Sequence, residues 1–143
     1  MISFIKAQVE KHKPSVIVGL GYSNGANILA SVIDKEPGLF GHAILMHPLV
    51  TWDFGRGESL EGTGFFMTAG GRDPICPPDM TGKLADMIET RGAKLKTFWH
   101  AGGHEVPQDE LDAVRAQISE IMAQIAGAKS LSIEHEDDGK KGR

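Results

Sequence analysis

The pattern of apolar and polar positions divides the chain into short apolar runs and segments with helical periodicity. Four runs rich in apolar or β-branched residues, typical of strands in a parallel sheet, are residues 15–21, 42–50, 65–69 and 94–100. Elsewhere apolar residues recur every three or four positions, which indicates amphipathic helices over residues 1–12, 24–36, 79–91 and 109–126. Strands that alternate with helices predict an α/β fold of about four mostly parallel strands, with helices on both faces.

Individual side chains are expected to fix the ends and the inward faces of these helices. Asp79 is a candidate N-cap for the third helix, and Gly92 is placed to end it. In the last helix the inward positions are expected to be Leu111, Val114, Ile118, Ile121 and Ile125. Residues 129–143 are charged and poor in large apolar side chains, so we expect a single domain over residues 1–128 followed by a disordered tail.

Composition narrows the classes of function. Of the 143 residues, 41% are hydrophobic and 24% are charged, and the formal net charge of −4 comes without a long basic run. A nucleic-acid partner is therefore not expected, and a small neutral substrate is favoured. No apolar stretch is long enough to span a membrane, and the N-terminus lacks the pattern of a signal peptide. The single cysteine, Cys76, excludes an intrachain disulfide and suits a reducing cytoplasm.

Residues 21–25, Gly-Tyr-Ser-Asn-Gly, match the G-x-S-x-G pattern that places a serine at a sharp turn between a strand and a helix. The motif lies directly after the first apolar run and before a helix whose N-terminus points at Ser23. We expect both Gly21 and Gly25 to be needed, because side chains there would crowd the turn. Ser23 is therefore the predicted nucleophile.

Two further residues follow strands in the order that such a hydrolase requires, an acid and then a histidine. Asp73 lies in Gly-Arg-Asp-Pro just after the third predicted strand, and His104 lies in Gly-Gly-His just after the fourth. The carboxyl ends of parallel strands meet at one edge of a sheet, with about 4.8 Å between neighbouring strands. We therefore expect the side chains of Asp73 and His104 to converge on Ser23.

Position along the chain disfavours the other acids and histidines. Asp53 is the alternative acid, and His47 could border the pocket although it precedes Asp73 in the sequence. Glu105 is adjacent to His104 and would have trouble reaching its ring. The remaining histidines precede strands, lie within a strand or belong to the tail: His12, His42, His100 and His135.

Neither a metal site nor a reactive thiol is expected. A paired-histidine zinc site needs its ligands one helical turn apart, whereas glycines and a proline make the segment with His100, His104 and Glu105 a loop. Cys76 has no helix N-terminus behind it, so a packed thiol is expected.

The elbow Gly-Tyr-Ser-Asn-Gly-Ala-Asn, the segment Gly-Arg-Asp-Pro-Ile-Cys-Pro-Pro and the loop Gly-Gly-His resemble those of the phospholipase/carboxylesterase family of α/β-hydrolases. The resemblance runs from about residue 15 to about residue 126 and includes Met-His-Pro at 46–48. It implies Ser23, Asp73 and His104 as a catalytic triad in a cytoplasmic enzyme that cleaves small carboxylic esters through an acyl-enzyme, with no metal or cofactor. A thioesterase or dienelactone-type hydrolase stays open, as does a catalytically inactive fragment that acts as an interaction module.

The neighbours of the nucleophile also receive expected roles. The backbone N–H of Asn24 is the expected oxyanion donor. Four side chains are candidates for the wall of the substrate pocket: Tyr22, His47, Trp52 and Phe54.

Family members begin with several further strands before the elbow, and this sequence departs from them there. A partial fold is therefore expected, in which one side of strand 15–21 has no neighbouring strand. Such an apolar edge should join two copies in a homodimer or cause aggregation. Because an early loop of the family supplies one oxyanion donor, whose loss costs about 10²- to 10³-fold in rate, we also expect weak or no activity from the chain alone.

Overall fold

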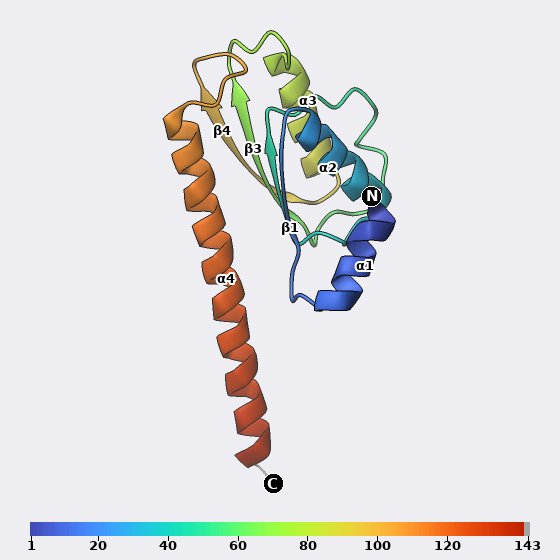
Figure 1. The fold of residues 1–143 in the computed structure, drawn as a ribbon, viewed down its shortest axis with the longest axis vertical. Coiled ribbons are helices and arrows are strands. Elements are labelled where there is room, and N and C mark those ends of the chain that lie inside the picture. Colours follow the sequence, from blue (N-terminus) through green and yellow to red (C-terminus); the bar gives the residue numbers. More distant parts are fainter. Residues whose placement is uncertain (142–143) are drawn as a thin grey trace.

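A computed structural model describes the backbone of residues 1–141 and the side chains of residues 1–128. Its centre is a parallel sheet with the strand order β1-β2-β3-β4, so the chain crosses the sheet in sequence (Figure 1). The strands are β1 (Val18–Tyr22), β2 (His42–Met46), β3 (Gly64–Gly70) and β4 (Lys94–His100). The helices are α1 (Ile2–His12), α2 (Asn24–Lys35), α3 (Pro78–Thr90) and α4 (Gln108–Lys141). The predicted α/β class with four parallel strands is confirmed.

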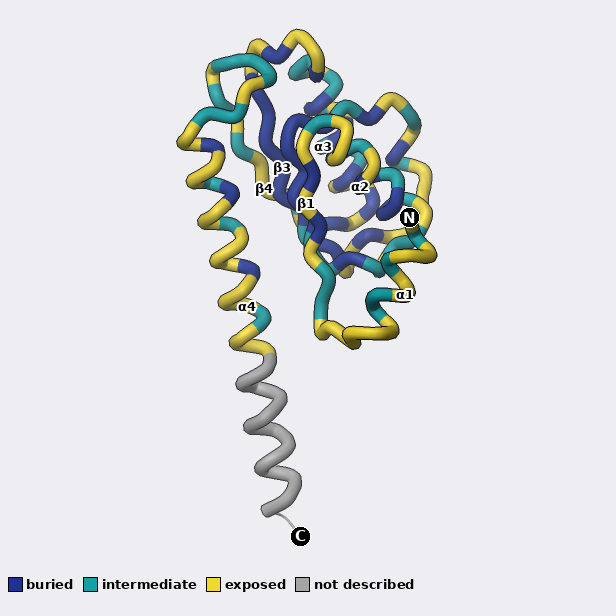
Figure 2. The backbone as a smooth tube through the Cα atoms, in the orientation of Figure 1, coloured by how far each residue is buried: buried dark blue, intermediate teal, exposed yellow. Residues whose placement is uncertain are grey.

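The helices cover the sheet from two sides and form two apolar cores. Helices α2 and α3 pack on one face around Leu29, Ile33, Leu84 and Ile88, with α1 at the periphery (Figure 2). Helix α4 covers the other face with a smaller set of side chains, in which Ile44, Met46, Phe66, Val114 and Ile121 are buried. Helices thus lie on both faces of the sheet, and the carboxyl ends of all its parallel strands lie at the same end of it.

The first strand differs from its prediction. It was expected to be buried on both faces from residue 15, but β1 begins at Val18 and alternates between exposed and buried positions. Val18, Leu20 and Tyr22 are 40%, 53% and 43% exposed, because they lie on the face of the sheet that α4 covers over β2 and β3 but not over β1. In addition, β2 is the only strand paired with β1 in the part of the chain that the structure describes. The expectation that this strand forms an apolar edge is confirmed.

Two details of the helices also differ from the sequence pattern. The N-cap of α3 is Pro77 and makes no side-chain capping bond, so Asp79 lies in the first turn and does not cap it. On α4, Val114, Ile121 and Ile125 face the sheet as predicted, but Glu110 is fully buried, whereas Leu111 and Ile118 are exposed. Periodicity alone favoured the apolar residue at position 111.

Helix α4 extends past the predicted end near residue 126. The expected disordered tail over 129–143 concerns residues outside those whose side chains are described, and it stays a prediction. Although α4 is long, neither it nor another helix in the described part of the chain has an apolar stretch that could cross a membrane.

Candidate active site

Ser23 occupies the sharp turn between β1 and α2. Its φ of 55° and ψ of −117° lie in a region that side chains rarely adopt, and such strain costs about 1–3 kcal/mol. A hydrogen bond from its backbone N–H to the Met46 carbonyl, 2.8 Å long, holds the turn against β2. A side chain at Gly21 would overlap the backbone of Gly25 and Ala26, whereas one at Gly25 would meet open space. The predicted steric need is therefore confirmed at Gly21 and wrong at Gly25.

The loops after β3 and β4 are bonded to each other through their backbones. The N–H of Gly71 donates to the His100 carbonyl (2.8 Å), and the N–H of Arg72 donates to the Gly102 carbonyl (2.9 Å). A side chain at Gly70 would collide with the carbonyl of Gly103, so this close approach depends on a glycine. The paired loops bring Asp73 and His104 to the same point above the sheet.

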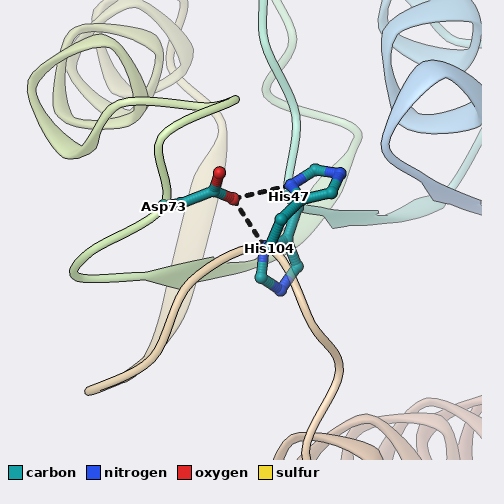
Figure 3. A group of neighbouring side chains, drawn as sticks. All are labelled: His47, Asp73 and His104. Carbon is teal, nitrogen blue, oxygen red and sulfur yellow. Dashed lines mark hydrogen bonds and ion pairs between the residues drawn. The ribbon is translucent and has the colours of Figure 1, made fainter.

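Three side chains from different strand ends form a continuous hydrogen-bonded chain. The Ser23 Oγ lies 2.9 Å from the His104 Nε2, and the His104 Nδ1 lies 2.7 Å from the Asp73 Oδ2 (Figure 3 shows the latter pair). A carboxylate can only accept, so the proton of His104 is on Nδ1 and its Nε2 is free to accept from the serine hydroxyl. The structure thus brings together the three residues that the sequence singled out.

Asp73 is buried among four hydrogen-bond donors. Its Oδ1 accepts the backbone N–H groups of Ile75 and Cys76, both at 2.8 Å. Its Oδ2 accepts from His104 and also from the Nδ1 of His47, at 3.0 Å. Burial alone would raise the pKa of Asp73, but the donors, led by the N–H of Cys76, outweigh it and hold the pKa well below its usual range. Asp73 is therefore a carboxylate at neutral pH.

Tyr22 and Cys76 border this group and keep their protons. The hydroxyl of Tyr22 donates to the backbone carbonyl of His104 at 2.7 Å, which ties the histidine loop to β1. Burial and the charge of Asp73 raise the pKa of Tyr22, and the same two causes raise the pKa of the Cys76 thiol to about 11. Cys76 donates to the carbonyl of His47 and is buried, as predicted for a packed thiol.

The expected pocket residues divide between the site and the core. Phe54 is fully buried with Arg91 stacked 4.8 Å above its ring, so the prediction that it lines a pocket is wrong. The indole N–H of Trp52 donates to Asp34 near the end of α2, and the side chain lines a surface hollow with Met80 and Met87, so its role in a substrate pocket stays a prediction. The prediction for His47 is wrong as well, because its side chain is fully buried and has no surface to offer a substrate.

Asp53, the alternative acid, and His100 take no part in the hydrogen bonds that link Ser23, His104 and Asp73, and His135 lies outside the residues whose side chains are described. The Asp53 carboxylate lies 2.8 Å from Arg56 and is half exposed. His100 is close to the site but bonds to the loop backbone: its Nδ1 accepts the N–H of Gly102 at 3.0 Å.

A buried group behind Asp73 escaped the sequence analysis. The Nε2 of His47 faces the carboxylate of Glu110, at 2.9 and 3.1 Å from its two oxygens, and the Nε2 of His100 lies 3.6 Å from the same carboxylate. The signal in the sequence was weak: Glu110 lies four residues before Val114, on the face that helical spacing marks as inward.

The same atoms form the two clusters that have metal-ligating side chains in the described residues. One comprises His47, Asp73 and His104, and the other comprises His47, His100 and Glu110. In the first cluster, both histidine Nδ1 atoms already donate to Asp73. A cation there would have to displace both protons that hold the carboxylate in place.

Comparisons with known proteins find hydrolases that are similar to this chain. No family model matches the chain. The MhqD protein of Bacillus subtilis, whose name describes a hydrolase, is 32% identical over 121 residues, which are 83% of this chain and 60% of MhqD. The structure of Bacillus cereus carboxylesterase superposes with a TM-score of 0.75 at 30% identity and covers 83% of this chain and 57% of that enzyme. The chain is similar to carboxylesterases and hydrolases and has the α/β-hydrolase fold. Atu2452 of Agrobacterium tumefaciens, a protein of unknown function, has a TM-score of 0.76 and 43% identity over 82% of this chain.

This α/β-hydrolase chain spans less than two thirds of the length of the relatives it matches: 60% of MhqD and 57% of the Bacillus cereus enzyme. Its four parallel strands and surrounding helices are a partial α/β-hydrolase fold, as the sequence predicted.

Proposed function

We propose that the chain carries the catalytic triad of a serine esterase, with Ser23 as nucleophile, His104 as general base and Asp73 as its orienting carboxylate. The observation that carries the proposal is the hydrogen-bonded chain from the Ser23 Oγ through both nitrogens of His104 to Asp73. Each link is short enough for proton transfer, which needs heavy atoms about 2.6–3.2 Å apart. The strained turn at Ser23 supports the same assignment, because strain of this kind persists where exposure of a reactive atom is needed.

The order of events follows from the positions of the protons. The lone pair of the His104 Nε2 takes the Ser23 proton while the Oγ attacks the acyl carbon, and the tetrahedral intermediate forms. The protonated ring then returns that proton to the leaving alcohol, which departs as the acyl-enzyme forms. Water repeats the two steps and releases the acid. Asp73 keeps its charge throughout and stabilises the imidazolium.

The first residue of α2 supports a role in oxyanion binding. Asn24 is the first residue of the helix, so its backbone N–H has no intrahelical partner, and it follows the nucleophile directly. The positive end of the helix dipole lies at the same place. We assign this N–H as one donor to the developing oxyanion.

A carboxylic ester is the proposed substrate, supported by the carboxylesterase of Bacillus cereus among the similar structures. A thioesterase or dienelactone-type hydrolase uses the same three side chains, so only acyl-donor preference separates these enzymes. Turnover of p-nitrophenyl esters against the matching thioesters and a lactone ranks the three classes.

The test of an activated serine is labelling by a fluorophosphonate probe, which reacts with serines that a neighbouring histidine deprotonates. We expect one probe per chain, mapped by mass spectrometry to Ser23, at a rate that falls as the pH is lowered and His104 becomes protonated. Labelling at another residue, or no labelling of the folded chain, would contradict the assignment and favour an inactive interaction module.

We further propose that two copies associate through β1, the exposed edge of the sheet. Only β2 pairs with β1 among the described residues, and the apolar side chains of Val18 and Leu20 are exposed on the face of the sheet beside that unpaired edge. Replacing Leu20 by Lys should make this association at least tenfold weaker, because a charge at an edge opposes strand pairing. Sedimentation velocity over a dilution series measures it, with Ile75→Lys, an exposed apolar position after β3, as control. A monomeric wild type contradicts this proposal.

The cytoplasmic location expected from the single cysteine stays a prediction.

A further inference from the structure

The proposed triad leaves a second group of buried polar side chains unexplained. His47, at the end of β2, and Glu110, in the first turn of α4, have fully buried side chains, and that of His100 is 5% exposed. Together they connect the inward face of α4 to the carboxylate of Asp73. Burial of charged and polar groups is costly unless each is paired, so their hydrogen bonds determine where the protons lie.

The proton on the Nδ1 of His47 is fixed by Asp73. The Asp73 Oδ2 accepts both His104 and His47, at 2.7 and 3.0 Å (Figure 3). Because Asp73 is ionised and has no proton to give, the Nδ1 of His47 must be the donor. The second ring nitrogen, Nε2, is therefore the one that decides the charge of His47.

His100 directs the proton on the other side. Its Nδ1 accepts the N–H of Gly102, so its own proton is on Nε2, where no acceptor lies within hydrogen-bond distance among the described residues. That N–H points at Glu110 from 3.6 Å. An N–H dipole directed at a carboxyl group favours its ionised form. An ionised Glu110 can only accept, so the Nε2 of His47 also carries a proton.

The same reasoning disfavours a cation between His47, His100 and Glu110. Coordination through the Nε2 of His100 would need a lone pair on an atom that carries the ring proton. The other nitrogen already uses its lone pair for Gly102. A histidine that binds a metal normally donates its other N–H, and the geometry of His100 is the reverse.

We infer that His47 is a buried imidazolium held between Asp73 and Glu110. Together, His47 and Glu110 position the carboxylate of Asp73 and make His104 harder to protonate. The inference rests on the proposed function. The rings of His47 and His104 have centroids 5.3 Å apart, so a positive charge on one opposes a positive charge on the other. A second donor on Oδ2 also keeps that oxygen turned toward His104. His47 and Glu110 are thus positioning residues that act through Asp73.

The other titratable groups around the two rings do not replace this effect. Tyr22 lies 5.8 Å from the ring of His47 and 5.4 Å from that of His104, and Cys76 bonds to the carbonyl of His47. Both keep their protons at neutral pH, since burial raises the pKa of each. His100 carries its single proton toward Glu110. The charges around the two rings are therefore those of Asp73, His47, Glu110 and the neighbouring Glu105, whose carboxylate accepts the N–H of Gly103 and is left unchanged by the variants below.

The wild-type chain supplies a direct measurement. Ring ¹⁵N chemical shifts distinguish an imidazolium from a neutral ring. We expect both nitrogens of His47 to stay protonated from pH 6 to pH 8. A neutral His47 at pH 7 would overturn the inference, whether or not the chain has esterase activity.

The variant Glu110→Gln tests the consequence. Without the carboxylate, His47 becomes neutral, and the pH midpoint of His104 should rise by about one unit, which two charges 5–6 Å apart at the intermediate dielectric of a protein can produce. NMR titration of the His104 ring gives this midpoint without catalysis, and the acid limb of fluorophosphonate labelling should move with it. Glu120→Gln is the matched control, because Glu120 lies on the same helix but pairs with Lys96 at the surface.

The outcomes separate this inference from the proposed function. A purely structural Glu110 would lower the melting temperature of the variant and leave the midpoint unmoved, which would overturn the inference. If Glu110→Gln does not fold, His47→Gln removes the same charge and should shift the midpoint upward as well. If the wild type is not labelled, the proposed esterase function is contradicted but this inference is not, because the NMR midpoint of His104 still reports the charge on His47.

Discussion

In an intact enzyme, replacing Ser23 by Ala is expected to lower the rate of ester turnover about 10⁶-fold, the size of effect seen when the nucleophile of a triad is removed. In the proposed mechanism, the Ser23 hydroxyl, 2.9 Å from His104, is the group that forms the covalent bond to the acyl carbon. Removing the Oγ leaves the backbone turn intact, because its strain is stored in φ and ψ and not in the side chain. The rate of fluorophosphonate labelling, measured by intact mass, should fall to background in parallel.

Ser31→Ala is the matched control for this variant. Ser31 lies on the same helix, α2, and takes no part in the hydrogen bonds around His104. It should keep wild-type turnover and labelling. Ser23→Ala protein that hydrolyses p-nitrophenyl acetate at the wild-type rate would refute the assignment of the nucleophile.

The second large effect is expected for Asp73→Asn, with a loss of about 10⁴-fold in turnover. Four donors converge on this carboxylate, two backbone N–H groups on Oδ1 and two histidine N–H groups on Oδ2. The amide N–H₂ of an asparagine would face donors on one side and force His104 into the tautomer with its proton on Nε2. In that tautomer the ring cannot accept the Ser23 proton. Stopped-flow or steady-state turnover at pH 8 measures the loss.

The same substitution should change how stability depends on pH. The folded-state pKa of Asp73 is lowered, so its carboxylate stabilises the fold above the unfolded-state value of about 3.9 and loses that contribution as the pH falls toward the folded-state value. The free energy of unfolding of the wild type, measured in urea, should therefore decrease below about pH 4. Asp73→Asn should be less stable at neutral pH and lack this part of the acid sensitivity. Asp86→Asn, at an exposed position on α3, is the control. If the stability of both variants depends on pH in the same way, the predicted contribution of Asp73 is contradicted.

The elements and the three residues of the proposed triad were accessible from the sequence because their signals are local. The apolar runs that became β2, β3 and β4 stand out by composition, and the turn at Gly21 by its short motif. Parallel pairing then places Asp73 and His104 at the same edge as Ser23. The mutual approach of their loops, fixed by Gly70 against Gly103, adds the register that composition cannot supply.

Pocket residues and the buried faces of helices were harder to predict from the sequence, since they depend on which side of an element packs on the sheet. Phe54 is aromatic, as residues that line a pocket often are, but its side chain packs in the core under Arg91. On α4, Leu111 and Glu110 compete for adjacent positions around the helix, and hydrophobicity favours the wrong one. Glu110 is the buried residue of the two because its carboxylate is paired with the ring of His47.

The sequence by itself determined the order of strands and helices, the strained turn with its serine, and the acid and histidine at neighbouring strand ends. Only the tertiary structure decided that His47 bridges Asp73 and Glu110, which is 63 residues away along the chain. The reason is physical: periodicity and turn chemistry act between residues a few positions apart, whereas the charge of a buried histidine depends on carboxylates that reach it through folding alone.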